Sequence, residues 1–262
     1  PTGESGDFEK ANFPIGVEGG KTSTCPTQNL MEAYDMKDGT PFVWNNQSNP
    51  YDNRDPRMKY TIVCNEMKWP VDPVEIWEGG TNGLPLQNAT TTGYYLKKYV
   101  NNTISFEAGS TVTKKQHNWV LFRYGEILLN YAEAMINAFH DPNYKDAVYN
   151  MSAREAVNQI RGRTNISLPG FPSDITEKDF VKRLKNERRV ELAFEGHRFW
   201  DVRRWKELGQ TANIYGVKIT KNNEVISYEK FLLETRAVTD NMYFYPIPNT
   251  ERFKNPNLGQ NP

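Results

Sequence analysis

The sequence shows no excess of charge of either sign: its 262 residues carry 32 basic and 32 acidic side chains. Nucleic acids and anionic membrane surfaces are held by a surplus of Lys and Arg. No apolar stretch approaches the roughly 20 residues that a bilayer-spanning helix needs. The first seven residues also lack the basic and apolar regions of a targeting segment. The composition therefore predicts no nucleic-acid partner and no membrane span, and any targeting segment is expected outside this chain.

Cysteine and histidine are scarce as well. The two cysteines, Cys25 and Cys64, are too few for a disulfide framework and too isolated for a zinc site. Three histidines lie far apart, with no second ligand at helical spacing: His117, His140 and His197. No glycine-rich phosphate loop and no serine nucleophile elbow occurs. We therefore predict no metal site and no cofactor.

Aromatic residues, in contrast, are abundant at 13%, with 6 Trp and 14 Tyr. Many lie on segments rich in Asn, Gly and Pro, and a flat ring with polar neighbours suits the binding of a sugar. Between residues 41 and 90 this pattern selects five candidate ligand-binding residues: Trp69, Trp77, Trp44, Tyr51 and Asn82. The alternative is that each ring packs beneath its own loop. Three other tryptophans fall in or beside predicted helices and are expected in the core: Trp119, Trp200 and Trp205.

Residues 1–120 are predicted to be a loop-rich, ligand-facing part of one domain. Gly, Pro, Asn and Thr interrupt the sequence, and only short runs at 60–63 and 94–100 have the composition of strands. One short helix is expected at 28–34, entered through a Pro-Thr pair.

Residues 121–208 are predicted to be helical. Apolar residues recur at intervals of three and four across 127–138, without Gly or Pro. A second helix is expected to begin at a capping box formed by Ser152 and Glu155. Small residues at the crossing make these two helices resemble one tetratricopeptide unit: Ala132 and Ala134 against Ala153 and Ala156.

Two more helices are expected in the helical part. One follows Thr176 and stops at Gly196, and the other runs over 197–208. Residues 209–262 are predicted to be an irregular tail, in which the extended segment 242–248 docks on the helices. The predicted fold class is therefore mainly α, with long loops, short strands and a tetratricopeptide-type helix pair under an irregular cap.

The stretch from 185 to 205 packs charges of both signs among large apolar side chains. On a helix, glutamates spaced by four align and repel one another unless cations face them. We predict a structural charge network in which Arg198, Arg203 and Arg204 of the next helix supply those cations. Its members are Glu187, Arg188, Glu191, Glu195, Arg198, Asp201 and Arg204. The alternative is a pair of catalytic carboxylates, but neighbouring guanidinium groups keep carboxylates ionised, whereas a general acid needs a raised pKa.

Residues 187–205 also match, at every fixed position, the pattern Glu-Arg-Arg-x-Glu-Leu-x-x-Glu-Gly-x-Arg-x-x-Asp-x-x-Arg-Trp. This pattern is the hallmark of the SusD/RagB-like proteins of Bacteroidetes. The passages 26–34, 51–57, 123–134 and 245–261 resemble the same family in the same order. The resemblance covers almost the whole chain and corresponds to the C-terminal half of the family, whose full members are much longer. Most of their tetratricopeptide-like helices lie in an N-terminal half that precedes the part matched here.

The resemblance implies a surface lipoprotein of the outer membrane, anchored through an N-terminal cysteine outside this chain. Such proteins capture oligosaccharides and deliver them to a TonB-dependent transporter of the SusC type, without cleaving them. Part of the ligand site is then expected from the N-terminal half of the same protein. Some relatives carry other nutrients, so a peptide cargo stays open.

The less favoured alternative is a glycan hydrolase that uses loop carboxylates around Trp77: Asp72, Glu75 and Glu78. Because the sequence shows no obvious basic cluster, we expect the ligand to be a neutral or weakly charged oligosaccharide.

Overall fold

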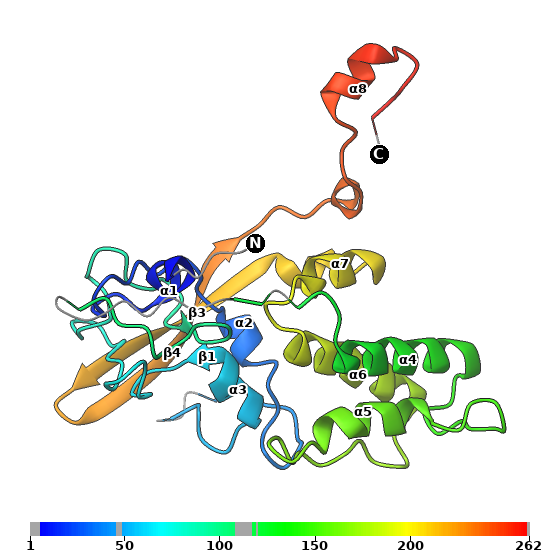
Figure 1. Cartoon of the computed structure of the whole chain (residues 1–262), viewed down its shortest axis with the longest axis horizontal. Helices are drawn as coiled ribbons and strands as arrows, with labels where there is room; N and C mark the ends of the chain where they lie inside the picture. The colour runs from blue at the N-terminus through cyan, green and yellow to red at the C-terminus, as the bar shows by residue number, and fades with distance from the viewer. Residues whose placement is uncertain (1–5, 46–48, 108–116, 119, 261–262) are drawn as a thin grey trace.

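A layer of helices lies beside a loop-rich part that contains one long β-hairpin (Figure 1). The computed structural model describes residues 6–45, 49–107, 117–118 and 120–260. The first half holds α1 (Asp7–Asn12), α2 (Gln28–Met31), α3 (Pro56–Thr61), β1 (Ile62–Val63) and β2 (Tyr95–Leu96). The helical layer holds α4 (Tyr124–Phe139), α5 (Ala153–Arg161), α6 (Glu177–Glu191) and α7 (His197–Arg204). The 3₁₀ helix η1 (Leu208–Thr211), β3 (Asn213–Asn222), β4 (Val225–Thr235), the 3₁₀ helix η2 (Asp240–Tyr243) and α8 (Asn249–Lys254) follow.

Helices α5 and α6 begin where the capping residues in the sequence predict. The Ser152 hydroxyl accepts a hydrogen bond from the Glu155 amide at 3.2 Å, and the Glu155 carboxylate accepts one from the Ser152 amide at 2.8 Å. This reciprocal capping box satisfies two amides that the helix itself leaves unpaired. Thr176 caps α6 by accepting from the Asp179 amide at 3.1 Å. The predicted starts of α5 and α6 are thus confirmed.

The helical layer has its own core, formed by α4, α5 and α6. On α4, Leu128, Leu129 and Ala132 are buried, and they pack with the fully buried Ala153 and Ala156 of α5. The predicted crossing of small residues is therefore confirmed on the α5 side. It is wrong for Ala134, which is exposed, as is Ile127 on the same helix. The apolar residues of α4 thus divide between a buried face and an exposed one.

The sequence predicted that α6 ends at Gly196, and this is wrong. The helix stops at Glu191, and Gly196 has a φ of 83° as the N-cap of α7. A left-handed residue at this point favours glycine, because a Cβ atom is strained there. Gly196 thus marks the turn between the two helices.

The largest departure from the predicted tail is the hairpin of β3 and β4. The two strands are antiparallel and Asn222 lies opposite Val225, so a two-residue turn joins them. Val217, Ile219 and Tyr228 from this hairpin are buried in the core of the loop-rich part. Residues 213–235 therefore form regular structure inside the fold, because alternating apolar side chains of β3 pack against the first half of the chain.

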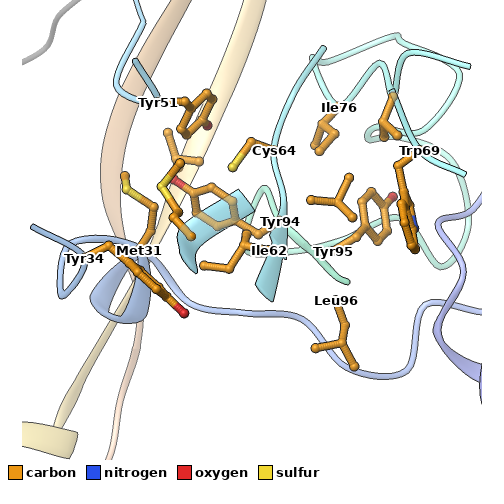
Figure 2. Packing of buried hydrophobic residues seen from close by; sticks show 14 of the residues in the cluster. Met31, Tyr34, Tyr51, Ile62, Cys64, Trp69, Ile76, Tyr94, Tyr95 and Leu96 are labelled. Atoms are coloured by element: carbon orange, nitrogen blue, oxygen red, sulfur yellow. The ribbon is translucent and has the colours of Figure 1, made fainter. Parts of the chain in front are cut away.

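The loop-rich part is held by an aromatic core. Figure 2 shows Met31, Tyr51, Tyr94 and Tyr95 among the buried side chains that gather there from segments far apart in the sequence. The strands predicted at 60–63 and 94–100 are shorter in the structure, where they form one antiparallel pair with Ile62 opposite Leu96. The loops are therefore ordered by side-chain packing more than by sheet hydrogen bonds.

Beyond the hairpin, α8 stands away from the body (Figure 1). The Tyr245 ring lies 5.9 Å from the Phe199 ring and 5.7 Å from the Trp200 ring, so the tail touches α7 there. The prediction that Trp200 is a core residue is wrong: its side chain is 55% exposed, because α7 buries only Asp201 and Val202. Trp205 is half-buried, and Trp119 lies outside the described residues. Among the described residues, no helix combines the length and apolar character needed to cross a membrane.

Candidate ligand-binding site

A column of glutamates that starts on α6 joins the helical layer to the loop-rich part. Glu187 binds Arg57 of α3 at 2.5 Å and Arg161 of α5 at 2.7 Å. Glu191 binds the same Arg57 at 2.9 Å. Because α3 and α5 belong to the two different parts, these buried carboxylates bridge them.

Three further cations bind the glutamates of the column. Arg123, the N-cap residue of α4, binds Glu191 and Glu195 at 2.7 Å each. Arg163 binds Glu191 at 2.8 Å, and Lys98 binds Glu195 at 2.6 Å. The glutamates are therefore satisfied by residues far away in the sequence.

The predicted cationic partners of the column are wrong. Arg198 donates to a glutamine side chain at 2.9 Å, and Arg203 lies over an aromatic ring of its own helix at 3.5 Å. Arg204 binds Asp201 at 2.9 Å, and Arg188 binds Asp201 at 2.8 Å. The α7 arginines thus have other neighbours, because distant arginines already occupy the column.

The glutamates of the column are held ionised. Burial by itself raises the pKa of Glu191, but its three arginine partners outweigh burial and lower that pKa to about 2. Burial is outweighed by neighbouring cations in the same way at Glu187 and Glu195, whose pKa values are also lowered. A general acid needs a raised pKa, so the column is suited to holding the fold together and not to donating protons.

Three of the five predicted ligand contacts are buried. Trp69 is 7% exposed and Tyr51 is 6% exposed, and both belong to the aromatic core shown in Figure 2. Asn82 is buried too, where its side chain donates to the Ile15 carbonyl at 2.6 Å and accepts from the Glu75 amide at 2.9 Å. The prediction that these residues present a surface to a sugar is corrected: their loops fold over them.

Two of the tryptophans predicted to contact the ligand remain partly exposed to solvent. Trp77 is half-buried, with the Lys221 ammonium 4.3 Å from its ring centre. Trp44 is half-buried and packs edge-on against Phe42, with ring centres 6.4 Å apart. Both lie at the margin of the aromatic core, where they contact different neighbours. These two remain candidates for sugar contact.

A cavity of about 450 Å³ lies next to Phe42, between α6, α7 and the segment 32–42. Phe42 and Pro41 form part of its wall, so Trp44 stands beside it through its contact with Phe42. Six Lys and Arg side chains also line the cavity. The expectation that the protein has no basic cluster is therefore wrong: five of the six cations lie on α6, between residues 178 and 189, and the sixth lies on α7.

Sequence reasoning gave no role to Arg189 or Phe42, which both line this cavity. The spacing of Arg189 could have indicated this position. Residues spaced by four share one face of a helix, so Arg189, two positions from Glu187 and from Glu191, lies on a different face from the glutamates. Phe42 carried no comparable signal. Among the described residues, no group of three His, Cys, Asp or Glu side chains is placed to hold a metal ion.

Comparisons with known proteins place this geometry in a family. The sequence model of the SusD family matches residues 4–262. A SusD-like protein from Bacteroides fragilis NCTC 9343 has a similar structure, with a TM-score of 0.78 and 26% identity over 97% of this chain and 51% of that chain. A second structure from the same strain, described as a SusD-like carbohydrate-binding protein, has a TM-score of 0.74 and 25% identity over 96% of this chain and 51% of that chain.

Among proteins known by sequence, SusD-like protein P2 of Formosa agariphila is 29% identical over 159 residues, which are 59% of this chain and 27% of the relative. The chain therefore belongs to the SusD family, and the predicted mainly α, SusD-like fold is confirmed. It spans about half the length of the two solved structures.

Proposed function

We propose that this protein captures an oligosaccharide at the cell surface without cleaving it. The observation that carries the proposal is membership of the SusD family across residues 4–262, together with a similar solved structure described as carbohydrate-binding. The half-buried Trp44 and Trp77 are the proposed ring contacts. An aromatic face beside polar groups is the surface that pyranose rings favour.

The contacts of the loop carboxylates favour binding over hydrolysis. Glu75 accepts hydrogen bonds from the hydroxyl and the amide of Thr81, at 3.0 and 3.3 Å. Glu78 is exposed and pairs with Lys218 at 3.3 Å. A hydrolase of the usual kind needs two carboxyl groups on either side of one bond, one of them with a raised pKa. The pairing of Glu75 and Glu78 with other groups supports a purely binding role.

We further propose that the protein is an outer-membrane surface lipoprotein that hands its ligand to a TonB-dependent transporter of the SusC type. Family membership supports this assignment. The anchor is then expected outside this chain, and part of the ligand site is expected from the N-terminal half of the same protein.

Affinity electrophoresis of the natural protein that contains this chain tests the proposal. The gels would hold starch, fructan, mannan, xylan, pectin or a host glycan, and a matched gel without polysaccharide is the control. We expect retardation by at least one glycan and weaker retardation of Trp44→Ala or Trp77→Ala. Retardation by none of them, with retention of peptides instead, would replace the glycan with a peptide cargo.

A further inference from the structure

The cavity beside Phe42 has an unusual charge balance. Six cationic side chains line it: Lys178, Lys182, Arg183, Lys185, Arg189 and Arg198. Only four carboxylates face them, from Glu32, Asp35, Glu187 and Glu207. The lining is therefore positive before any partner outside the cavity is considered.

Each of those carboxylates is already matched by a cation. Glu207 binds Lys185 at 2.5 Å, and Glu32 binds a lysine of β4 at 2.7 Å. Asp35 binds Arg161 at 3.3 Å and Arg183 at 3.5 Å, and Glu187 belongs to the buried column. Among the described residues, no carboxylate of the lining forms an ion pair with the other four cations, although Glu32 acts on Arg189 and Glu207 acts on Arg198 at longer range.

Four lining cations have no ion pair among the described residues, and of these Lys178 and Lys182 are exposed, whereas Arg189 and Arg198 are half-buried. Within the described part of the chain, Arg189 makes no hydrogen bond or ion pair, and Arg198 makes one hydrogen bond, to the Gln210 side chain at 2.9 Å. Burial, and then the charge of Arg198, lower the pKa of Arg189 to about 10 against the opposing effect of Tyr34 and Glu32, so Arg189 is charged at neutral pH. Two like charges that face a cavity with no carboxylate in hydrogen-bond contact cost free energy, part of which a bound anion would recover.

We infer that this cavity binds a carboxylate or sulfate group of an acidic oligosaccharide through Arg189 and Arg198. The planar guanidinium fork matches both anions and can donate two parallel hydrogen bonds to each. Phe42 and Pro41 offer an apolar wall for the sugar ring that carries the charge, and the exposed Lys178 and Lys182 add attraction for an anion. The inference rests on the proposed glycan binding and replaces the expectation of a neutral ligand.

The first test asks whether the anion site exists, with inorganic sulfate as the probe. Sodium sulfate is titrated calorimetrically into the natural protein that contains this chain, at an ionic strength held constant with sodium chloride. We expect saturable binding that becomes at least about tenfold weaker in Arg189→Gln and in Arg198→Gln, because each loses charge-assisted hydrogen bonds. Arg236→Gln is the matched control, since Arg236 is exposed and pairs with Glu234 at the end of β4.

Thermal melting accompanies each variant. Arg198 forms no ion pair among the described residues, although the charges of Glu207 and Asp201 favour its charged form, so Arg198→Gln keeps the test valid if Arg189→Gln unfolds. Equal sulfate binding in the parent and in a folded Arg198→Gln variant would overturn the site, and so would no saturable sulfate binding in the parent.

The second test asks whether a glycan supplies the anion. Gels containing polygalacturonate, alginate or chondroitin sulfate are compared with gels containing neutral xylan, mannan or starch. We expect retardation by an acidic glycan that is lost in both cavity variants and kept in Arg236→Gln. Retardation that is confined to neutral glycans, or that is unchanged in the variants, would overturn the acidic-glycan assignment and leave glycan binding intact. Sulfate binding through Arg189 without retardation by any glycan would instead overturn the proposed function and leave an anion site.

Discussion

Replacing Glu191 by Gln should destabilise the fold strongly, because this carboxylate holds three arginines. Its oxygens lie 2.9 Å from Arg57, 2.7 Å from Arg123 and 2.8 Å from Arg163. The amide keeps the shape of the side chain and removes its charge. Arg57 and Arg123 keep other carboxylates, whereas Arg163 loses the carboxylate that it binds here.

The expected loss of unfolding free energy in Glu191→Gln follows from the pKa of Glu191 and from the cost of breaking a buried ion pair. The pKa of Glu191 falls from 4.5 to about 2 in the folded chain, which corresponds to about 3 kcal/mol of stability at neutral pH. Removing one member of a buried ion pair costs about 3 to 5 kcal/mol. Since two of the arginines keep a partner, we expect the lower end of that range, about 3 kcal/mol.

Urea denaturation of the parent and of Glu191→Gln measures this loss. Glu234→Gln is the control, because Glu234 is exposed and pairs only with Arg236 among the described residues. A lowered folded pKa means that the stabilisation is complete above about pH 4.5 and is lost as the pH falls toward 2. The difference between parent and variant should therefore shrink across that window. A Glu191→Gln protein as stable as the control, or a difference that does not change with pH, would refute the reasoning.

Three further predictions follow from the packing. Trp69→Ala should lower the free energy of unfolding by about 3 to 5 kcal/mol, whereas Trp77→Ala should lower it by less and weaken glycan binding, measured calorimetrically, by about 1 to 3 kcal/mol; the opposite pattern would contradict the site. Asn223→Ala should cost about 1 kcal/mol in thermal melts, because the turn residue has a φ of 54°, and an unchanged melt would contradict the hairpin turn. Residues 1–262 expressed alone should bind an apolar dye more strongly than the same residues joined to the proposed N-terminal half, because Ile127 is 50% exposed; equal dye binding would show that this face is not covered.

Local signals in the sequence were sufficient where the structure depends on neighbours along the chain. The capping box of Ser152 and Glu155 lies within four residues, so α5 could be predicted from spacing alone. Thr176 fixed the start of α6 in the same way.

Contacts between residues far apart in the sequence could not be predicted from residue spacing. Arg57 is 130 residues from Glu187, and a single sequence gives no reason to pair them over the nearer Arg198. The burial of Trp69 depends on loops that fold over it, and these positions carry no periodic pattern. Such residues become known only when the packing is known.

The hairpin is a different kind of failure, because its signals were present. Val217 and Ile219 alternate with Lys218, which is typical of a half-buried strand. Asn223, the first residue of the two-residue turn, is of a type that favours tight turns. The segment was nevertheless predicted to be part of an irregular tail, although the charged residues in it suit the exposed face of a strand.

The central claim is that the protein binds an oligosaccharide and does not cleave it. One measurement tests both parts: calorimetric titration of the natural protein with a purified oligosaccharide, followed by a reducing-sugar assay and chromatography of the same sample. We expect saturable heat of binding and recovery of the oligosaccharide at its original length. Release of shorter products, or no heat with any glycan of an acidic and neutral panel, would contradict the account.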